Sequence, residues 1–333
     1  MKRLNMAVCL LLAAVMILSV TACGKDDDLH LITSQEETSS IEKEVKTKVA
    51  ALSGPVGLGL AKMKEDRAYG YDVTYYDSPE KISSLIENGE ADIATVPLET
   101  AASLWNKNGG KIKVLAVVSL GYLQVVENGD SIESISDLKG KTVYSCGEGT
   151  AAECIFDYIL SENDLDPEKD VKAEYVASAS ELETMIKEGK AEVCILPQPD
   201  AAKTASENEK YRIALDLEDE IEKISDSGLA MGCIIARSDY IEANPDIISE
   251  FITFAEVSSN FANLFEIGSN TLYSLGYFET KELAAATVPG CHLVFIYGED
   301  MNKICDKTME VLNEANPDVI GNAVPGPDFY FAE

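Results

Sequence analysis

A glycine-rich turn is the first place in this sequence where residue types and spacing suggest chemistry. Gly147, Gly149 and Ala152 satisfy the G-x-G-x-x-A spacing of dinucleotide-binding turns, between a predicted strand and a predicted helix. No clear acidic residue closes a second strand about twenty residues further on, as that fingerprint requires. The turn therefore predicts backbone amides that face some other ligand at a helix N-terminus, or a turn without a ligand.

Groups for acid–base or nucleophilic catalysis are scarce. His30 lies in a polar N-terminal segment and His292 in an apolar run near the C-terminus. The sequence contains no G-x-S-x-G, H-E-x-x-H or Walker A motif. Carboxylates could supply an acid and a base, but 58 acidic residues make any single pairing uninformative. We predict no catalytic residue and no cofactor.

Three hydroxyl residues stand beside similar turns at predicted strand ends. They are Ser53, Thr95 and Thr150. Each alone fits helix capping as well as it fits ligand contact. Their equivalent positions in two parts of the chain favour ligand contact.

The elements that must position these residues occur twice. Residues 78–102 match residues 178–202 at an offset of one hundred, and both copies are typical of helix, turn, strand, loop and helix. At an offset of ninety-two, Ser53 and Gly57 match Ser145 and Gly149. Such a repeat predicts two similar α/β lobes with a cleft between them.

The chain divides into four expected parts. Residues 1–22 have the basic start and short apolar run of a signal peptide. Residues 20–23 look like the lipobox of bacterial lipoproteins, which implies lipid attachment at Cys23; an ordinary signal-peptide cleavage site is the alternative. Residues 23–45 are polar and predict a flexible stalk. Residues 46–120 with 228–333 are expected to form lobe 1 and residues 121–227 lobe 2, with Gly121 at a bend between the lobes.

Charge excludes some partners. The net charge of the 333-residue chain is −31, which disfavours binding to nucleic acids and to anionic lipid surfaces. It fits the solubility of an exported protein that meets the membrane through its lipid alone.

Six cysteines remain outside the signal peptide and lipobox, and none of them forms a C-x-x-C pair. We predict no metal site, and we favour buried free thiols over one or two disulfides. These cysteines are Cys146, Cys154, Cys194, Cys233, Cys291 and Cys305.

The loops expected to line the cleft contain no Lys or Arg, but they hold Glu99, Glu148 and Asp200. This composition predicts a neutral or amine-bearing small solute. The expected ligand-binding residues are Ser53, Gly54, Pro55, Val56, Thr95, Pro97, Leu98, Gly121, Tyr122, Gly147, Gly149, Thr150, Pro197 and Gln198.

Five motifs together resemble the substrate-binding lipoproteins of ABC importers, and most of all the sulfonate, nitrate and thiamine-precursor binding group. They lie at residues 53–62, 89–94, 137–143, 147–150 and 196–199. The resemblance implies a type II periplasmic-binding fold of class α/β, with two doubly wound lobes, a central ligand cleft and two crossover strands. It further implies closure on a solute and delivery to a permease driven by an ATPase. Gln198 replaces the glutamate that this group usually carries, so a charge contact there is not implied.

Two other functional classes remain open from the sequence. One is an enzyme on the same fold, of the pyrimidine-precursor or menaquinone-pathway type, which would turn over a captured solute. The other is a surface adhesion or signalling lipoprotein, whose cleft would be closed by side chains.

Overall fold

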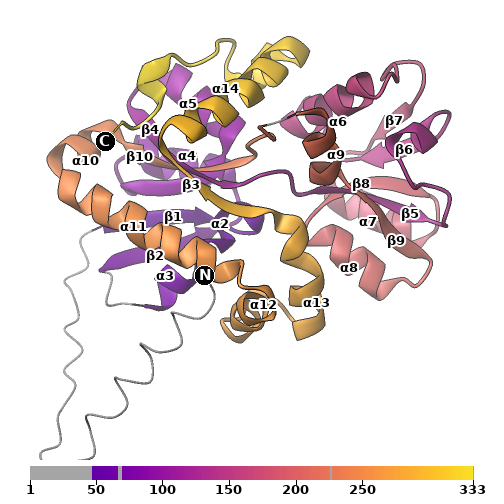
Figure 1. Ribbon diagram of the computed structural model, residues 1–333, viewed down its shortest axis with the longest axis horizontal. Coiled ribbons are helices and arrows are strands. Elements are labelled where there is room, and N and C mark those ends of the chain that lie inside the picture. The colour runs from indigo at the N-terminus through magenta and orange to yellow at the C-terminus, as the bar shows by residue number, and fades with distance from the viewer. Residues whose placement is uncertain (1–46, 67–69, 226, 333) are drawn as a thin grey trace, which may run out of the picture. The chain divides into compact units, whose positions relative to one another are not determined.

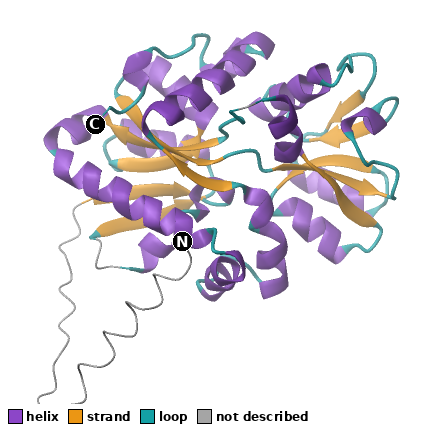
Figure 2. Ribbon diagram, in the orientation of Figure 1, coloured by secondary structure: helices purple, strands orange, loops and turns teal. Residues whose placement is uncertain are grey.

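The computed structural model describes residues 47–66, 70–225 and 227–332. The predicted signal peptide (residues 1–22), the predicted stalk (residues 23–45) and Cys23 lie outside the described residues. Within them, no helix is both long enough and apolar enough to cross a membrane. The described chain forms a six-stranded and a five-stranded sheet, each flanked by helices (Figure 2).

The six-stranded sheet has the order β11-β4-β10-β3-β1-β2. β1, β2 and β3 run parallel, whereas β10 is antiparallel to both of its neighbours, β3 and β4. β3 is buried at every position, as expected of a strand covered on both faces. The strands are β1 (Thr47–Leu52), β2 (Tyr71–Tyr76), β3 (Ile93–Pro97), β4 (Ile112–Ser119), β10 (Gly232–Arg237) and β11 (Leu293–Ile296).

The five-stranded sheet repeats this plan with the order β7-β6-β8-β5-β9. β6, β7 and β8 are parallel, and β5 is antiparallel to β8 and β9. The strands are β5 (Leu123–Asn128), β6 (Thr142–Ser145), β7 (Lys172–Tyr175), β8 (Val193–Pro197) and β9 (Tyr211–Asp216).

Each sheet contains one inner strand that the chain enters by a connection from the other sheet (Figure 1). β5 follows β4 through residues 120–122, the first crossover, and enters the five-stranded sheet. β10 follows α9 (Leu217–Ile224) and the second crossover, residues 227–231, and enters the six-stranded sheet. We call the six-stranded sheet with its helices lobe 1 and the five-stranded sheet with its helices lobe 2.

Helices and short 3-10 turns fill the connections. Before the first crossover lie α2 (Pro55–Leu58), α3 (Ala61–Glu65), α4 (Pro79–Glu87) and α5 (Leu98–Asn108). Lobe 2 contains η2 (Ile135–Leu138), α6 (Ala151–Glu162), α7 (Ala179–Lys187), α8 (Asp200–Glu207) and α9. After the second crossover come α10 (Ser238–Ala243), α11 (Pro245–Ala262), α12 (Phe265–Ser274), α13 (Lys281–Thr287), η3 (Pro289–Cys291), α14 (Gly298–Ala315), η4 (Pro317–Ile320) and η5 (Pro327–Phe329).

The sequence repeat is also a structural repeat. The Ser78 hydroxyl accepts the Lys81 N–H at 3.2 Å and caps α4, and the Ser178 hydroxyl accepts the Glu181 N–H at 3.2 Å and caps α7. Each helix turns at a glycine into a strand of five residues, β3 or β8, that ends at a proline. The predicted two-fold use of one α/β unit is therefore confirmed.

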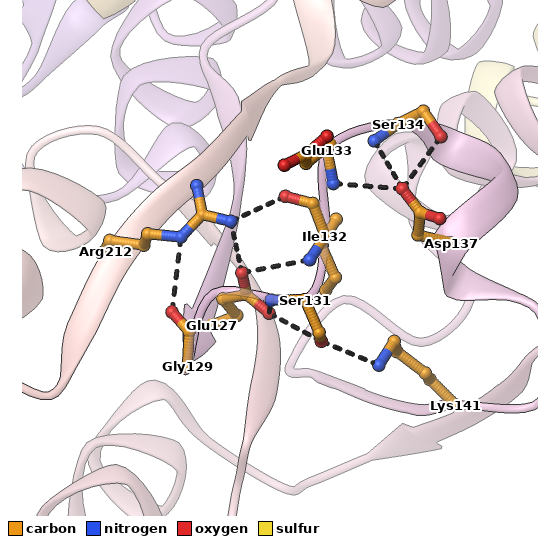
Figure 3. A network of polar contacts seen from close by, with 9 residues as sticks. All are labelled: Glu127, Gly129, Ser131, Ile132, Glu133, Ser134, Asp137, Lys141 and Arg212. Carbon is orange, nitrogen blue, oxygen red and sulfur yellow. Dashed lines mark hydrogen bonds and ion pairs between the residues drawn. The ribbon is translucent and has the colours of Figure 1, made fainter.

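A polar network fixes the loop after β5 to the sheet of lobe 2 (Figure 3). The buried Glu127 carboxylate pairs with the Arg212 guanidinium and accepts the N–H of Ile132 at 3.1 Å and of Ser131 at 3.2 Å. Arg212 also donates to the carbonyl oxygens of Gly129 at 3.2 Å and Ile132 at 2.7 Å. Burial opposes ionisation of Glu127, but these donors hold its pKa below the usual range.

All six cysteines of the described chain are free thiols. Five are buried and Cys146 is exposed. Burial raises the pKa of the Cys154 thiol to about 11 and that of Cys194 to about 12, so these side chains pack as small apolar groups.

Candidate functional site

An open cavity of about 810 Å³ lies where the two lobes and the α12–α13 region meet. Lobe 1 contributes the end of β1, the start of α2 and the end of β2, and lobe 2 contributes the loop between β8 and α8. The cavity is lined by Leu52, Ser53, Gly54, Pro55, Val56, Leu58, Lys64, Tyr75, Asp77, Tyr122, Pro197, Gln198, Pro199, Asp200, Gly276, Tyr277, Phe278, Thr287 and Cys291. Carboxyl ends of parallel strands are the usual place for a ligand in such sheets.

Half of the residues predicted to bind a ligand line this cavity. They are Ser53, Gly54, Pro55, Val56, Tyr122, Pro197 and Gln198. The first four enter it because the chain turns sharply after β1, with Gly54 at a φ of 85° and Pro55 at the first position of α2. The structure thus brings loops of both lobes together.

Three predicted residues of lobe 1 lie in the protein interior instead. The Thr95 hydroxyl is fully buried and accepts the Leu52 N–H at 2.8 Å, which ties the end of β1 to β3. Pro97 is the last residue of β3, and the Leu98 N–H donates to the Met231 carbonyl at 3.1 Å. None of the three lines the cavity, so in this structure they support its wall.

The glycine-rich turn of lobe 2 also stays outside the lining. The Thr150 hydroxyl donates to the Gly147 carbonyl at 2.6 Å, and the Gly149 N–H donates to the Glu153 carboxylate at 2.5 Å. These contacts occur within the turn and its helix. Ligand binding by Gly147, Gly149 and Thr150 stays a prediction.

An aromatic group that the sequence analysis missed covers part of the cavity. The rings of Tyr75 and Tyr277 meet edge to face with centroids 5.2 Å apart. Lys64 Nζ lies 5.2 Å from the Tyr75 ring centre and 5.8 Å from that of Tyr277. The position of Tyr75 at the end of a parallel strand could have indicated it, whereas Tyr277 lies between two helices far along the chain and has no such signal.

The charges of the lining residues are few and mainly negative. Asp77 and Asp200 are exposed in the cavity, and Lys64 is the cation that lines it. Burial raises the pKa of the Tyr122 phenol, and the carboxyl group of Glu99, which lies at the start of α5 and does not line the cavity, raises it further. Burial raises the pKa of Glu99 itself to about 7.

A polar wall faces the η3 segment. A Cβ atom on Gly290 would lie 2.8 Å from Gln198 Nε2 and 3.2 Å from Gln124 Nε2, so both amides approach the bare backbone. Gln198 Oε1 accepts the Ala202 N–H at 3.3 Å. Gln124 Nε2 and Thr287 Oγ1 are buried without a hydrogen-bond partner in the described chain. Thr287 therefore offers an unused hydroxyl at the cavity wall.

A family model described as the phosphonate periplasmic substrate-binding protein of ABC transporters matches residues 60–244, which is more than half of the chain. The chain belongs to this family. No curated protein matches the chain. As a periplasmic substrate-binding protein, the molecule captures a solute for import, and its two lobes and crossovers form the periplasmic-binding fold.

Several solved structures share this fold with the substrate-binding protein described here. An ABC transporter structure from Parabacteroides distasonis has a TM-score of 0.73 and 22% identity, over 87% of this chain and 100% of that one. The aliphatic sulphonate binding protein SsuA from Escherichia coli has a TM-score of 0.65 and 12% identity, over 84% and 91%. The alkanesulfonate-binding protein SsuA from Xanthomonas axonopodis, bound to MOPS, has a TM-score of 0.61 and 12% identity, over 82% and 94%.

The described part of this binding protein contains no group of three or more His, Cys, Asp or Glu side chains placed to hold a metal ion. The lining of the cavity combines aliphatic and aromatic side chains with amides, hydroxyls and a few charges. Such groups select a solute by shape and hydrogen bonding.

Proposed function

We propose that the cavity between the lobes captures a small organic solute, and that the closed protein delivers this solute to an ABC permease driven by an ATPase. One observation carries the proposal: both lobes line the cavity, and two short crossovers connect them. A solute that contacts both lobes binds the closed form more tightly than the open form and shifts the population toward closure.

Export and lipid attachment form part of this proposal. The apolar run at residues 6–20 and the lipobox-like residues 20–23 support a lipoprotein tethered through Cys23 to the outer face of the cytoplasmic membrane. Replacement of Cys23 by alanine should release the protein from the membrane fraction. Equal membrane association of the variant and the natural chain would contradict the anchor.

A neutral or amine-bearing solute suits the lining. Asp77 and Asp200 provide two negative charges, while Lys64, the one cation among the described lining residues, lies over the rings of Tyr75 and Tyr277. An amine could reach a carboxylate and an aromatic face at once. An anionic solute would meet repulsion from the two aspartates.

The direct test is native mass spectrometry of the purified protein, to identify any small molecule that copurifies. Binding of three probes that share a phenethyl group should then be compared by calorimetry: phenethylamine, phenethyl alcohol and 2-phenylethanesulfonate. We expect the sulfonate to bind most weakly. Equally tight binding of the sulfonate would contradict the solute class, and steady turnover of a bound molecule would favour an enzyme instead.

A further inference from the structure

Glu218 has a carboxyl group enclosed between the two crossovers. It is the second residue of α9, and its side chain is fully buried. Oε2 accepts the Gly121 N–H of the first crossover at 2.8 Å. A Cβ atom on Gly121 would lie 2.5 Å from Oε2, and one on Gly228 of the second crossover would lie 3.2 Å from Oε1. Both crossovers therefore have a glycine where they meet this carboxyl group.

The second oxygen of the group is unsatisfied. Glu218 Oε1 is buried and has no hydrogen-bond partner in the described chain. A buried carboxylate with one donor carries a large desolvation cost, which protonation removes. Burial raises the pKa of Glu218 to about 7, although the Gly121 N–H and the charge of His292 act in the opposite direction.

An ion pair connects the start of α9, where Glu218 lies, to the segment between η3 and β11. His292 Nε2 lies 2.8 Å from Asp216 Oδ2, and Asp216 Oδ1 accepts the Glu218 N–H at 3.0 Å. The His292 carbonyl in turn accepts the N–H of Leu120 in the first crossover at 3.0 Å. Burial alone would lower the pKa of His292, but Asp216, Glu218 and Asp219 raise it.

The charged groups that act on the Glu218 carboxyl come from three elements. They are His292 of the C-terminal segment, Glu222 of α9 itself and Asp216 of β9. β5 and α6, which also pack against α9, supply none of them. From the crossovers the carboxyl meets the backbone of Gly121 and Gly228.

We propose that Glu218 is a positioning residue of the hinge, which keeps the two crossovers together while it is protonated and lets them separate when it loses its proton. This inference rests on the proposed function, because it concerns how the lobes open and close around a solute. The ionised group needs water at Oε1, so conformations with separated crossovers gain population as the pH rises. The charge of His292 lowers the pKa of the Glu218 carboxyl, so loss of that charge keeps Glu218 protonated to higher pH and acts in the opposite direction.

Hydrogen–deuterium exchange of the full chain without solute tests the hinge directly. Peptides covering residues 120–124 and 227–231 should be compared at about pH 6 and about pH 8, with correction for intrinsic exchange. We expect protection in these peptides to fall by about tenfold in the natural protein, because each pH unit above the carboxyl pKa is a tenfold change in its protonated fraction.

Two variants separate proton loss from mere packing. Glu218→Gln keeps an acceptor for Gly121 and cannot ionise, so its crossovers should be equally protected at both pH values. Glu314→Gln removes an exposed carboxylate of α14 that does not act on Glu218, and it should behave as the natural protein. Should Glu218→Gln fail to fold, His292→Gln decides, because loss of that positive charge should shift the fall in protection to higher pH.

Equal protection of the natural protein at both pH values, or an equal fall in Glu218→Gln, would overturn the hinge role. A His292→Gln profile without a shift would do so as well. Each of these results would leave solute capture standing. Conversely, a protein that captures no solute could still show the expected exchange profile.

Discussion

Tyr75 and Tyr277 supply an aromatic corner of the cavity, with Lys64 above both rings. The Tyr75 hydroxyl donates to the Gly57 carbonyl at 2.9 Å, which fixes that ring against the turn after β1. Tyr277 comes from the segment between α12 and α13, which lies far from Tyr75 in the sequence. Rigid aromatic side chains of this kind contribute much of the affinity at binding sites.

We expect Tyr277→Ala to weaken solute binding by about 10- to 100-fold, equivalent to ~1–3 kcal/mol, because it removes a large contact area in the cavity. Calorimetry with the copurified solute measures this change. Tyr297→Ala is the matched control, since Tyr297 is exposed and does not line the cavity. A similar loss in both variants would contradict the role of Tyr277.

Replacement of Asp77 by asparagine should separate charge from shape. The side chain keeps its size but loses its charge, so we expect phenethylamine to bind about 2- to 5-fold more weakly, as for an exposed ion pair. Binding of phenethyl alcohol should stay unchanged. An amine that binds equally well to the variant would show that Asp77 does not contact it.

The loops that follow the strands could be predicted, but their partners could not. Ser53, Gly54 and Pro55 stand out because glycine and proline mark a turn after an apolar strand. Lys64 and Tyr277 reach the cavity through tertiary packing, for which no local pattern exists. Thr95 shows the converse, because it lies in the middle of β3 and its hydroxyl accepts the N–H of Leu52 in the neighbouring strand.

Capping serines begin the equivalent helices α4 and α7. We expect Ser78→Ala and Ser178→Ala each to lower the free energy of unfolding by about 1 kcal/mol, because an N–H of the first turn loses its acceptor. Urea denaturation measures both. Ser84→Ala, inside α4, is the control and should be neutral or slightly stabilising. A Ser84→Ala loss as large as the cap losses would contradict the capping account.

The network around Glu127 predicts a larger loss in lobe 2. Arg212→Ala should lower the free energy of unfolding by about 3 kcal/mol, because it leaves a buried carboxylate without its cation. The pKa of Glu127 is lower in the folded protein than in the unfolded chain. The stability that Glu127 contributes is therefore fully present above the unfolded pKa and is lost as the pH falls through the folded pKa.

Chemical denaturation near neutral pH and in acid measures this effect. The difference between Arg212→Ala and the natural protein should shrink in acid. Lys187→Ala, which breaks an exposed pair with Glu183, should change stability by less than about 0.5 kcal/mol. An equal effect of the two substitutions would contradict the network's role.

Helices and strands with a local pattern could be predicted, as the repeat of α4 and β3 in α7 and β8 shows. The segment after β1 forms two short helices, α2 and α3, interrupted at residues 59–60. Gly57 and Gly59 weaken a helix there. The antiparallel insertion of β10 between β3 and β4 depends on residues far apart in the chain, which periodicity does not report.

Across the whole molecule, the cavity depends on parts that are distant in sequence. Residues 52–58, 197–200 and 276–291 contribute to its lining, and they belong to different elements. Sequence analysis could predict a cleft from the repeated lobes, but not that the α12–α13 region would also line it. That region has no counterpart in lobe 2, so internal comparison of the halves gave no indication of it.

The exchange of β5 and β10 between the sheets has a consequence for dividing the chain. A polypeptide ending at residue 130 would contain β5 without the sheet that receives it, and its own sheet would lack β10. The remaining piece would have the reciprocal defect. We expect each piece alone to stay unfolded by circular dichroism, whereas coexpressed pieces should complement one another and copurify as one folded assembly.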